Sequence, residues 1–282
     1  MTLRLLHLSD THLTGDGSLH HGLVDTTAAL DRVLQRAVTA GPLDAVVLAG
    51  DLSDDGSPAS YAALRSRVDR FAADHGAVVV AVPGNHDDRA AFELALGPRC
   101  AVHDVRGHRI VALDTSVPGA GYGHVPPGLL TWLAEALAPP APGGAVVVLH
   151  HPPVPAASTL LRALELVEPE PLLDVLEAAG VRLVLAGHYH HGMVQQVRGI
   201  PVVVSPGVAN HSDPLAAAGT ERAVVGAGLD LVDLSDDGAV RVTFVEAPGP
   251  DDGAEVFALD AAAVRSIAEA AGPTGPAAAV VS

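Results

Sequence analysis

The first third of the chain alternates short apolar runs with amphipathic segments. Three runs rich in Val, Leu and Ala, at residues 3–8, 45–49 and 78–82, are typical of strands buried on both faces. The segment after Asp25 carries apolar residues at helical spacing on one face, with Asp25 as its N-cap. A second helix is expected at residues 58–74, with proline at its permitted first position. This order predicts parallel strands joined by right-handed crossovers.

Beyond residue 88 the pattern changes to paired short strands. Hairpins are expected where two runs flank a turn, at residues 102–105 with 109–114, 193–198 with 200–205, and 223–234 with 240–245. Buried single strands are expected at residues 145–149 and 182–186, and helices at 129–137 and 171–179. A parallel first half and a hairpin-rich second half predict an α/β fold of two mixed sheets stacked face to face, with helices outside.

The composition limits the kinds of partner and chemistry that are expected. The formal net charge is −17, which argues against a nucleic-acid or anionic-membrane surface. All 16 basic residues are arginines, so Schiff-base chemistry and a Walker A lysine are excluded. The single Cys100 can form no internal disulfide, and no apolar run is long enough for a spanning helix. We therefore expect a cytoplasmic protein that binds no membrane.

Metal-ligand side chains follow five of the predicted strands. They are Asp10 and His12, Asp51, Asn85, His150, and His188 with His190. Residues two apart at a strand end can point the same way. Carboxylate, amide and imidazole ligands together suit Mn, Fe, Co or Zn, and one cysteine excludes a thiolate site. Seven ligands suit two ions with one bridging carboxylate. An isolated buried histidine is more often a core residue, but five such strand ends in order argue against coincidence.

These residues lie in five motifs that resemble the signatures of the calcineurin-like metallophosphoesterases. The motifs are Asp10-Thr11-His12, Gly50-Asp51, Gly84-Asn85-His86-Asp87, His150-His151-Pro152-Pro153 and Gly187-His188-Tyr189-His190. The resemblance implies a four-layer αββα sandwich with a dinuclear centre. It places Asp10, His12 and His190 on the first metal, Asp51 as the bridge, and Asn85, His150 and His188 on the second. It also places the catalytic His86 over the leaving-group oxygen.

Three loops resemble those of bacterial class III cyclic nucleotide phosphodiesterases. They follow Gly50, Gly84 and Leu113, and the last continues as Asp114-Thr115-Ser116-Val117-Pro118-Gly119. The resemblance implies that a metal-bridging hydroxide opens the ring of a 3′,5′-cyclic nucleotide and converts cAMP to 5′-AMP. One alternative is broader activity on 2′,3′-cyclic nucleotides, glycerophosphodiesters or other small diesters. Another is a non-catalytic scaffold with this fold, although all seven ligand positions carry competent residues.

The remaining expectations concern the domain limits and the surroundings of the site. We expect a catalytic domain at residues 1–246 and an extension at 247–282 with one short helix from Asp260 and a disordered tail. Asn85, His86 and His190 are expected to contact substrate, and Asn210 and His211 are weaker candidates. His20 and His108 are expected on the surface, His151 behind the ligands, and Asp54-Asp55 in a loop that leads into a helix. A homodimer remains open.

Overall fold

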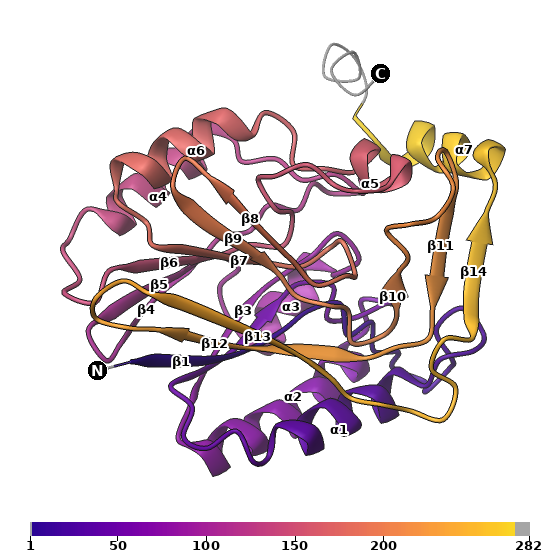
Figure 1. Ribbon diagram of the computed structural model, residues 1–282, viewed down its shortest axis with the longest axis horizontal. Helices are drawn as coiled ribbons and strands as arrows, with labels where there is room; N and C mark the ends of the chain where they lie inside the picture. Colours follow the sequence, from indigo (N-terminus) through magenta and orange to yellow (C-terminus); the bar gives the residue numbers. More distant parts are fainter. Residues whose placement is uncertain (1, 274–282) are drawn as a thin grey trace.

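Two mixed β-sheets stacked face to face form the centre of the molecule (Figure 1). The computed structural model describes residues 2–273. The first sheet has the order β13-β12-β1-β2-β3, with the strands Val240–Glu246, Gly228–Leu234, Leu3–Leu8, Ala45–Ala49 and Val78–Val82. The second has the order β4-β5-β6-β7-β9-β8, with Ala101–Val105, His108–Ala112, Ala145–Val148, Leu183–Ala186, Ile200–Val204 and Met193–Val197.

Helices cover the outer face of each sheet. On the first sheet lie α1 (Thr26–Ala37), α2 (Pro58–His75) and α3 (Arg89–Leu96); on the second lie α4 (Pro127–Leu137) and α6 (Pro169–Ala178). The predicted caps are present, because Asp25 accepts a hydrogen bond from the Ala28 amide and α2 begins at a proline. The four-layer αββα arrangement expected from the sequence is confirmed.

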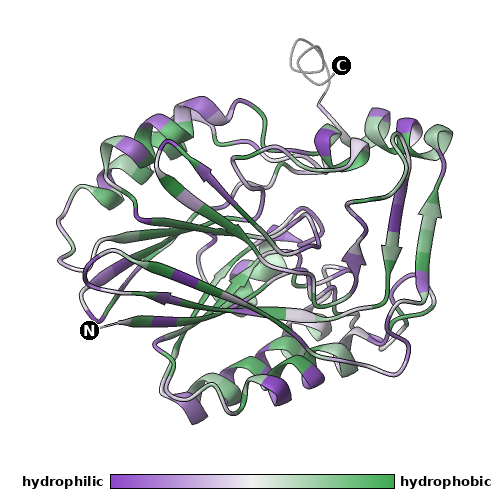
Figure 2. Ribbon diagram, viewed as in Figure 1, coloured by the Kyte–Doolittle hydropathy of each residue, from purple (hydrophilic) through white to green (hydrophobic). Residues whose placement is uncertain are grey.

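Three apolar layers hold this stack together. One lies between the sheets and is built mainly of valine and leucine, including Leu5, Val47 and Val148. The other two lie between each sheet and its helices, around Leu30 on one side and Leu176 on the other. The central strands are therefore apolar on both faces, as Figure 2 shows.

Parallel pairing brings the ends of distant strands to one edge. β1 pairs in parallel with β2, and β2 with β3, while β5, β6, β7 and β9 form a parallel run in the other sheet. The carboxyl ends of these strands therefore meet at the same end of the sandwich. Open α/β sheets usually bind ligands at this edge.

A third, smaller sheet was not predicted. It has the order β10-β11-β14, with the strands His211–Ser212, Glu221–Val224 and Glu255–Leu259. The segment expected as one strand at 223–234 is broken into β11 and β12 around Gly226. The extension after residue 246 therefore contributes a strand, β14, as well as the expected helix α7 (Ala261–Ala271), which packs against α5 (Thr159–Ala163). The expected tail at 274–282 lies outside the described residues.

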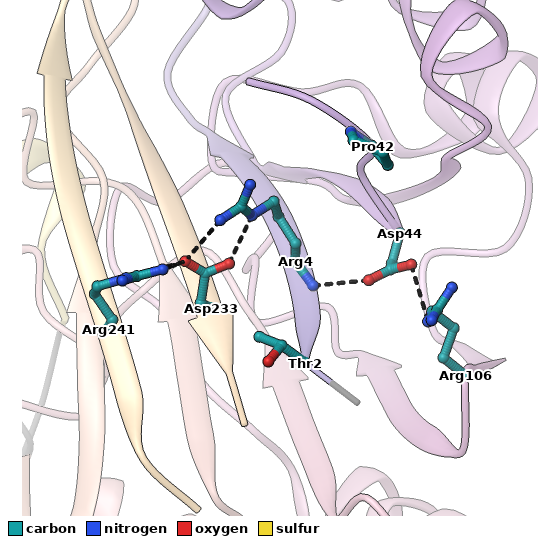
Figure 3. Close-up of a pocket in the computed structure, with 7 residues that line it drawn as sticks. All are labelled: Thr2, Arg4, Pro42, Asp44, Arg106, Asp233 and Arg241. Carbon is teal, nitrogen blue, oxygen red and sulfur yellow. Dashed lines mark hydrogen bonds and ion pairs between the residues drawn. The ribbon is translucent and has the colours of Figure 1, made fainter. Parts of the chain in front are cut away.

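At the amino end of β1, a cluster of ion pairs joins the strands of the first sheet to one another (Figure 3). Asp233 on β12 accepts hydrogen bonds from Arg4 Nε at 2.7 Å and from Arg241 Nη2 at 2.6 Å. Asp44 accepts from the Arg4 amide at 2.8 Å and lies 3.3 Å from Arg106 Nε. This end of the sandwich is thus closed by paired charges. Within residues 2–273, no helix combines the length and apolar character needed to cross a membrane.

Candidate metal centre

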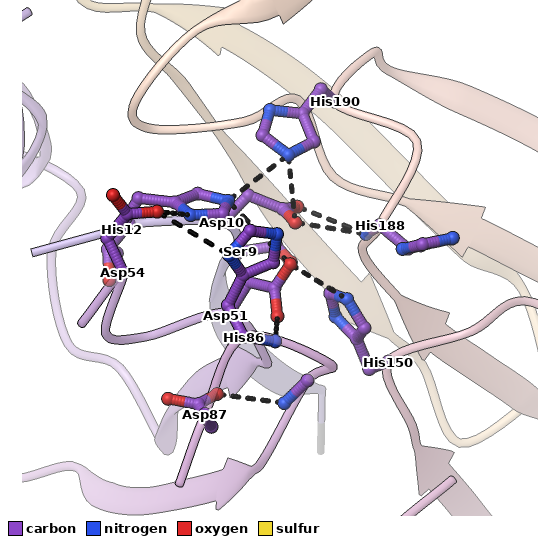
Figure 4. A network of polar contacts seen from close by, with 12 residues as sticks. Ser9, Asp10, His12, Asp51, Asp54, His86, Asp87, His150, His188 and His190 are labelled. Carbon is purple, nitrogen blue, oxygen red and sulfur yellow. Dashed lines mark hydrogen bonds and ion pairs between the residues drawn. The ribbon is translucent and has the colours of Figure 1, made fainter. Parts of the chain in front are cut away.

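The strand ends bring the predicted ligands into one cluster (Figure 4). Asp10 and His12 follow β1, Asp51 follows β2, His150 follows β6, and His188 with His190 follow β7. Asn85 follows β3, and its buried Oδ1 has no hydrogen-bond partner. The two sheets therefore each supply part of the cluster.

Asp51 lies at the middle of the cluster. Its Oδ1 accepts a hydrogen bond from the His86 amide at 2.8 Å. Its Oδ2 lies 3.3 Å from His150 Nε2 and 3.7 Å from His12 Nε2. One carboxylate oxygen thus faces a histidine from each sheet, which is the position that a bridging carboxylate requires.

Asp10 organises the other side. Its Oδ1 lies 3.3 Å from His190 Nε2, and its carboxylate accepts the His188 amide at 3.1 Å. The His190 Nε2 atom is in turn only 3.4 Å from His12 Nε2. Two imidazole nitrogens therefore point at each other beside two carboxylates.

The outer nitrogens of three histidines are already occupied. The Nδ1 atoms of His12, His150 and His190 lie 3.0, 2.7 and 3.2 Å from the oxygens of Asp54, Ala49 and Asn210. A proton on Nδ1 leaves the lone pair on Nε2, which faces the cluster. His150 Nε2 has no directed hydrogen bond there. Inward lone pairs beside buried carboxylates are the donor set that a transition-metal ion completes.

His188 and His151 differ although they lie close together. His188 Nε2 donates to the Leu164 carbonyl at 2.9 Å, so its Nδ1 carries the lone pair. Both His151 nitrogens contact protein oxygens, with Nδ1 at 2.8 Å from Thr115 Oγ1 and Nε2 at 3.2 Å from the Gly121 carbonyl. The contacts leave His188 available as a ligand, whereas His151 supports the site from behind.

Several of these residues adopt the left-handed backbone conformation. Among the described residues, nine non-glycine residues have positive φ, and Asp10, His12, Asp51, His188 and His190 are five of them. Such conformations are costly for non-glycine residues and concentrate at functional sites. The strained turns aim both members of each two-residue motif inward, which simple strand alternation does not explain.

Two motif glycines allow the turns to approach closely. A Cβ on Gly50 would lie 2.4 Å from His150 Nδ1, and one on Gly84 would lie 2.2 Å from Asp51 Oδ1. Neither position has room for a side chain. The glycines of Gly50-Asp51 and Gly84-Asn85 thus permit the carboxylate and histidine to meet.

Burial and charge shift the pKa values in opposite directions across the cluster. Burial raises the pKa of Asp10 and lowers that of His12 to about 4, so each is driven toward its neutral form. Burial opposes the charged form of His150 as well, but the Asp51 carboxylate raises its pKa to about 9. A positive charge is therefore favoured beside Asp51.

Asp54 has a role that the sequence analysis did not assign. Its carboxylate lies 3.0 Å from His12 Nδ1, 3.2 Å from His20 Nδ1 and 3.5 Å from His86 Nδ1. Asp55 fills the expected role, because it accepts the Ser57 amide just before α2.

Two histidines expected on the surface are buried. His20 is 4% exposed and His108 is 2% exposed, so both expectations are wrong.

Asp87 fixes the turn that carries Asn85. It accepts the amides of Gly84, Leu52 and Ser53 at 2.8, 3.1 and 3.0 Å. It thereby joins the loops after β2 and β3.

The two weaker substrate candidates lie in the segment between β9 and β11. Asn210 is buried, and its backbone carbonyl orients His190. His211 begins β10, where it pairs with Val224.

An αββα sandwich with clustered aspartate and histidine side chains at its strand ends has the features of a metal-dependent hydrolase. The chain belongs to the calcineurin-like phosphoesterase family, whose model matches residues 3–192. The chain is similar to a "Probable cyclic nucleotide phosphodiesterase" of Rhodococcus erythropolis, with 40% identity over 93% of this chain and 91% of that protein. It is also similar to the "cAMP/cGMP dual specificity phosphodiesterase" of Mycobacterium tuberculosis, with 41% identity over 94% of this chain and 86% of that protein.

The fold is shared more widely. The structure of purple acid phosphatase from yellow lupin (Lupinus luteus) matches with a TM-score of 0.58 at 14% identity, covering 98% of this chain and 57% of that one. At this identity the match supports the fold alone.

Proposed function

We propose that this enzyme hydrolyses 3′,5′-cyclic nucleotides, converting cAMP to 5′-AMP. The observation that carries the proposal is the group of aspartate and histidine side chains gathered beside Asp51, with the His86 amide bonded to the same carboxylate. Support for the substrate comes from the two relatives, which match nearly the whole chain and are named cyclic nucleotide phosphodiesterases.

The residues present fit a pair of metal ions. We assign Asp10, His12 and His190 to one ion, Asn85, His150 and His188 to the other, and Asp51 to both. The unpartnered Asn85 Oδ1 and His150 Nε2 atoms support this assignment, since a buried polar atom without a partner is costly. Their nitrogen and oxygen donors suit Mn, Fe, Co or Zn. When bound, two such ions lower the pKa of a water and stabilise charge on the phosphoryl oxygens.

His86 is placed to act on the leaving group. Its side chain is 45% exposed, whereas its amide is fixed to Asp51 and its Nδ1 lies 3.5 Å from Asp54. In this proposal the Asp54 carboxylate orients the His86 ring through Nδ1, and the ring donates a proton through Nε2. As the oxygen of water bonds to phosphorus and the P–O3′ bond breaks, His86 protonates the ribose O3′. The product carries a 5′-phosphate and a free 3′ hydroxyl.

The substrate in this proposal is a small molecule held by Asn85, His86 and His190 at the open side of the cluster.

We also propose residues 1–246 as the catalytic domain. Residues 247–282 are then an extension, which is joined to that domain by the pairing of β14 with β11.

A hydrolysis panel tests the function. The purified holoenzyme is incubated with cAMP, 2′,3′-cyclic AMP and a glycerophosphodiester, and products are identified by chromatography. We expect 5′-AMP from cAMP as the fastest reaction. No turnover of 3′,5′-cyclic nucleotides alongside rapid cleavage of another diester would reject the proposed substrate and favour the broader phosphodiesterase activity.

A further inference from the structure

A cleft of about 550 Å³ lies between α3, the start of α4 and the loop after β5. We propose that it holds the nucleobase of the substrate while the phosphate lies at the metal centre. This inference rests on the proposed function, and it identifies the residues that would recognise the part of the substrate not involved in the chemistry.

The loop after β5 separates the cleft from the histidine cluster. Thr115 faces the cluster, because its hydroxyl lies 2.8 Å from His151 Nδ1, and the His151 and His150 rings are 4.8 Å apart. The next residue, Ser116, lines the cleft. The Thr115 carbonyl also accepts the amide of His124, another lining residue, at 2.9 Å. Thr115 and Ser116 therefore connect His151, which lies behind the candidate ligands, to the wall of the cleft.

Helix α3 brings the cleft close to the proposed acid. Arg89 is the first residue of α3 and follows His86 by three positions, which limits the separation of their Cα atoms to about 11 Å. Arg89 Nε donates to Ser116 Oγ at 3.1 Å, and Nη2 donates to the Ser116 carbonyl. These bonds join the turn after β3 to the loop after β5. The cleft therefore begins at a residue only three positions after the proposed acid.

The lining suits a flat ring with polar edges. Val117, Pro118, Pro126 and Leu129 supply apolar walls, and the fixed guanidinium of Arg89 supplies a planar surface that can stack on a ring. Such a surface would contact both faces of a base without contacting a phosphate.

Two groups in the cleft can read the edge of a base. Among the described residues, Arg89 Nη1 has no hydrogen-bond partner, although the other two guanidinium nitrogens are bonded to Ser116. Glu93, one helical turn further along α3, bonds Arg99 through Oε1 and leaves Oε2 without a bond among the described residues. A donor and an acceptor one turn apart on α3 match adenine, which presents a ring nitrogen next to an amino group.

The arginines do not make this cleft a phosphate site. Arg89 and Arg99 both lie against the buried carboxylate of Asp114, at 3.6 and 2.5 Å. Their charge is therefore partly neutralised, and a neutral base is a better ligand for the cleft than an anion.

The test compares two ligands that differ only in the base. Binding of 5′-AMP and of ribose 5-phosphate to the holoenzyme is measured by calorimetry for the natural protein, for Val117→Trp, which fills the cleft, and for Leu94→Trp. Leu94 also lies on α3 but is 84% exposed and outside the cleft, so it is the matched control. We expect the natural protein and Leu94→Trp to prefer AMP by about tenfold. Val117→Trp should bind the two ligands equally, with ribose 5-phosphate binding unchanged.

The outcomes separate this inference from the proposed function. If cAMP is hydrolysed but all three proteins prefer AMP to the same degree, or none prefers it, the cleft assignment is overturned and the proposed function stands. If no cyclic nucleotide is hydrolysed, the proposed function fails and the base site falls with it. Loss of ribose 5-phosphate binding in Val117→Trp would show a damaged active site, and Val117→Phe would then replace it; an unchanged AMP preference in that variant also overturns the assignment.

Discussion

The amide of His86 donates a 2.8 Å hydrogen bond to Asp51 Oδ1, so the proposed acid and the proposed bridging ligand are fixed to each other. The other oxygen of the same carboxylate faces His12 and His150. In the proposed mechanism, a single side chain therefore sets the position of both metal sites and of the group that acts on the leaving oxygen.

Replacing Asp51 should empty both metal positions together. In Asp51→Asn the amide can still accept from His86, but its charge is lost between the two histidines. We expect metal content per chain to fall at both positions and activity to drop by more than the roughly 10- to 100-fold typical of changes to residues that only support a metal ligand. Elemental analysis of the purified protein measures this. Asp31→Asn, which removes an exposed partner of Arg67, is the control. A variant that kept two ions at unchanged affinity would show that Asp51 does not bridge.

His86→Ala separates general acid catalysis from metal binding. A ribose alkoxide leaves poorly without a proton, so activity on cAMP should fall by about 10²–10⁴-fold. Bis(4-nitrophenyl) phosphate has a good leaving group and should be affected much less. Metal content should stay normal, as in the control His103→Ala on β4. Equal losses on both substrates would instead assign His86 to charge stabilisation on the phosphoryl oxygens.

Asp233 should make stability depend on pH at the closed end of the sandwich. Its hydrogen bond from Arg4, together with Arg241, holds the pKa of Asp233 below its ordinary value. A lowered folded-state pKa stabilises the protein above the unfolded-state value of about 3.9, and this stabilisation is lost as pH falls through the folded-state pKa. Asp233→Asn should therefore lower the free energy of unfolding at pH 7 by about 1 kcal/mol. Urea titrations between pH 7 and pH 3 should show the difference shrinking; a constant difference would contradict this.

Two truncations test what the extension contributes. Ending the chain after Ala271 keeps β14 and α7, including the Gly121 amide bond to the Ala271 carbonyl at 2.8 Å, and should leave melting temperature and activity nearly unchanged. Ending it after Gly253 removes β14 from β11 and deletes α7 with Val264, which uncovers Leu160 and Leu164. The melting temperature should then fall by at least about 5 °C. Equal melting temperatures for the two truncations would show that β14 and α7 add no stability.

The parallel strands and the seven candidate ligands could be predicted because they rest on local patterns. Val78–Val82 is an unbroken apolar run, and Asn85 comes directly after its Pro-Gly stop. The contacts of Asp54 with His12 and His20 could not be predicted in the same way. They join residues 42 and 34 positions apart in sequence through tertiary packing, which leaves no periodic trace. The third sheet was missed because β10 has only two residues and β11 only four.

The left-handed turns of the metal centre lower the stability of the fold, but they carry the side chains that activity needs. At φ = 44°, His12 adopts a backbone conformation that glycine tolerates and alanine does not. In metal-stripped protein, the free energy of unfolding of His12→Gly should therefore exceed that of His12→Ala by about 1 kcal/mol, although both lack the ring. His12→Gly should accordingly unfold at a higher urea concentration. The same holds at Asp10, Asp51, His188 and His190. Selection for stability alone would thus favour glycine at these positions, and only selection for catalysis retains the side chains that hold the centre together.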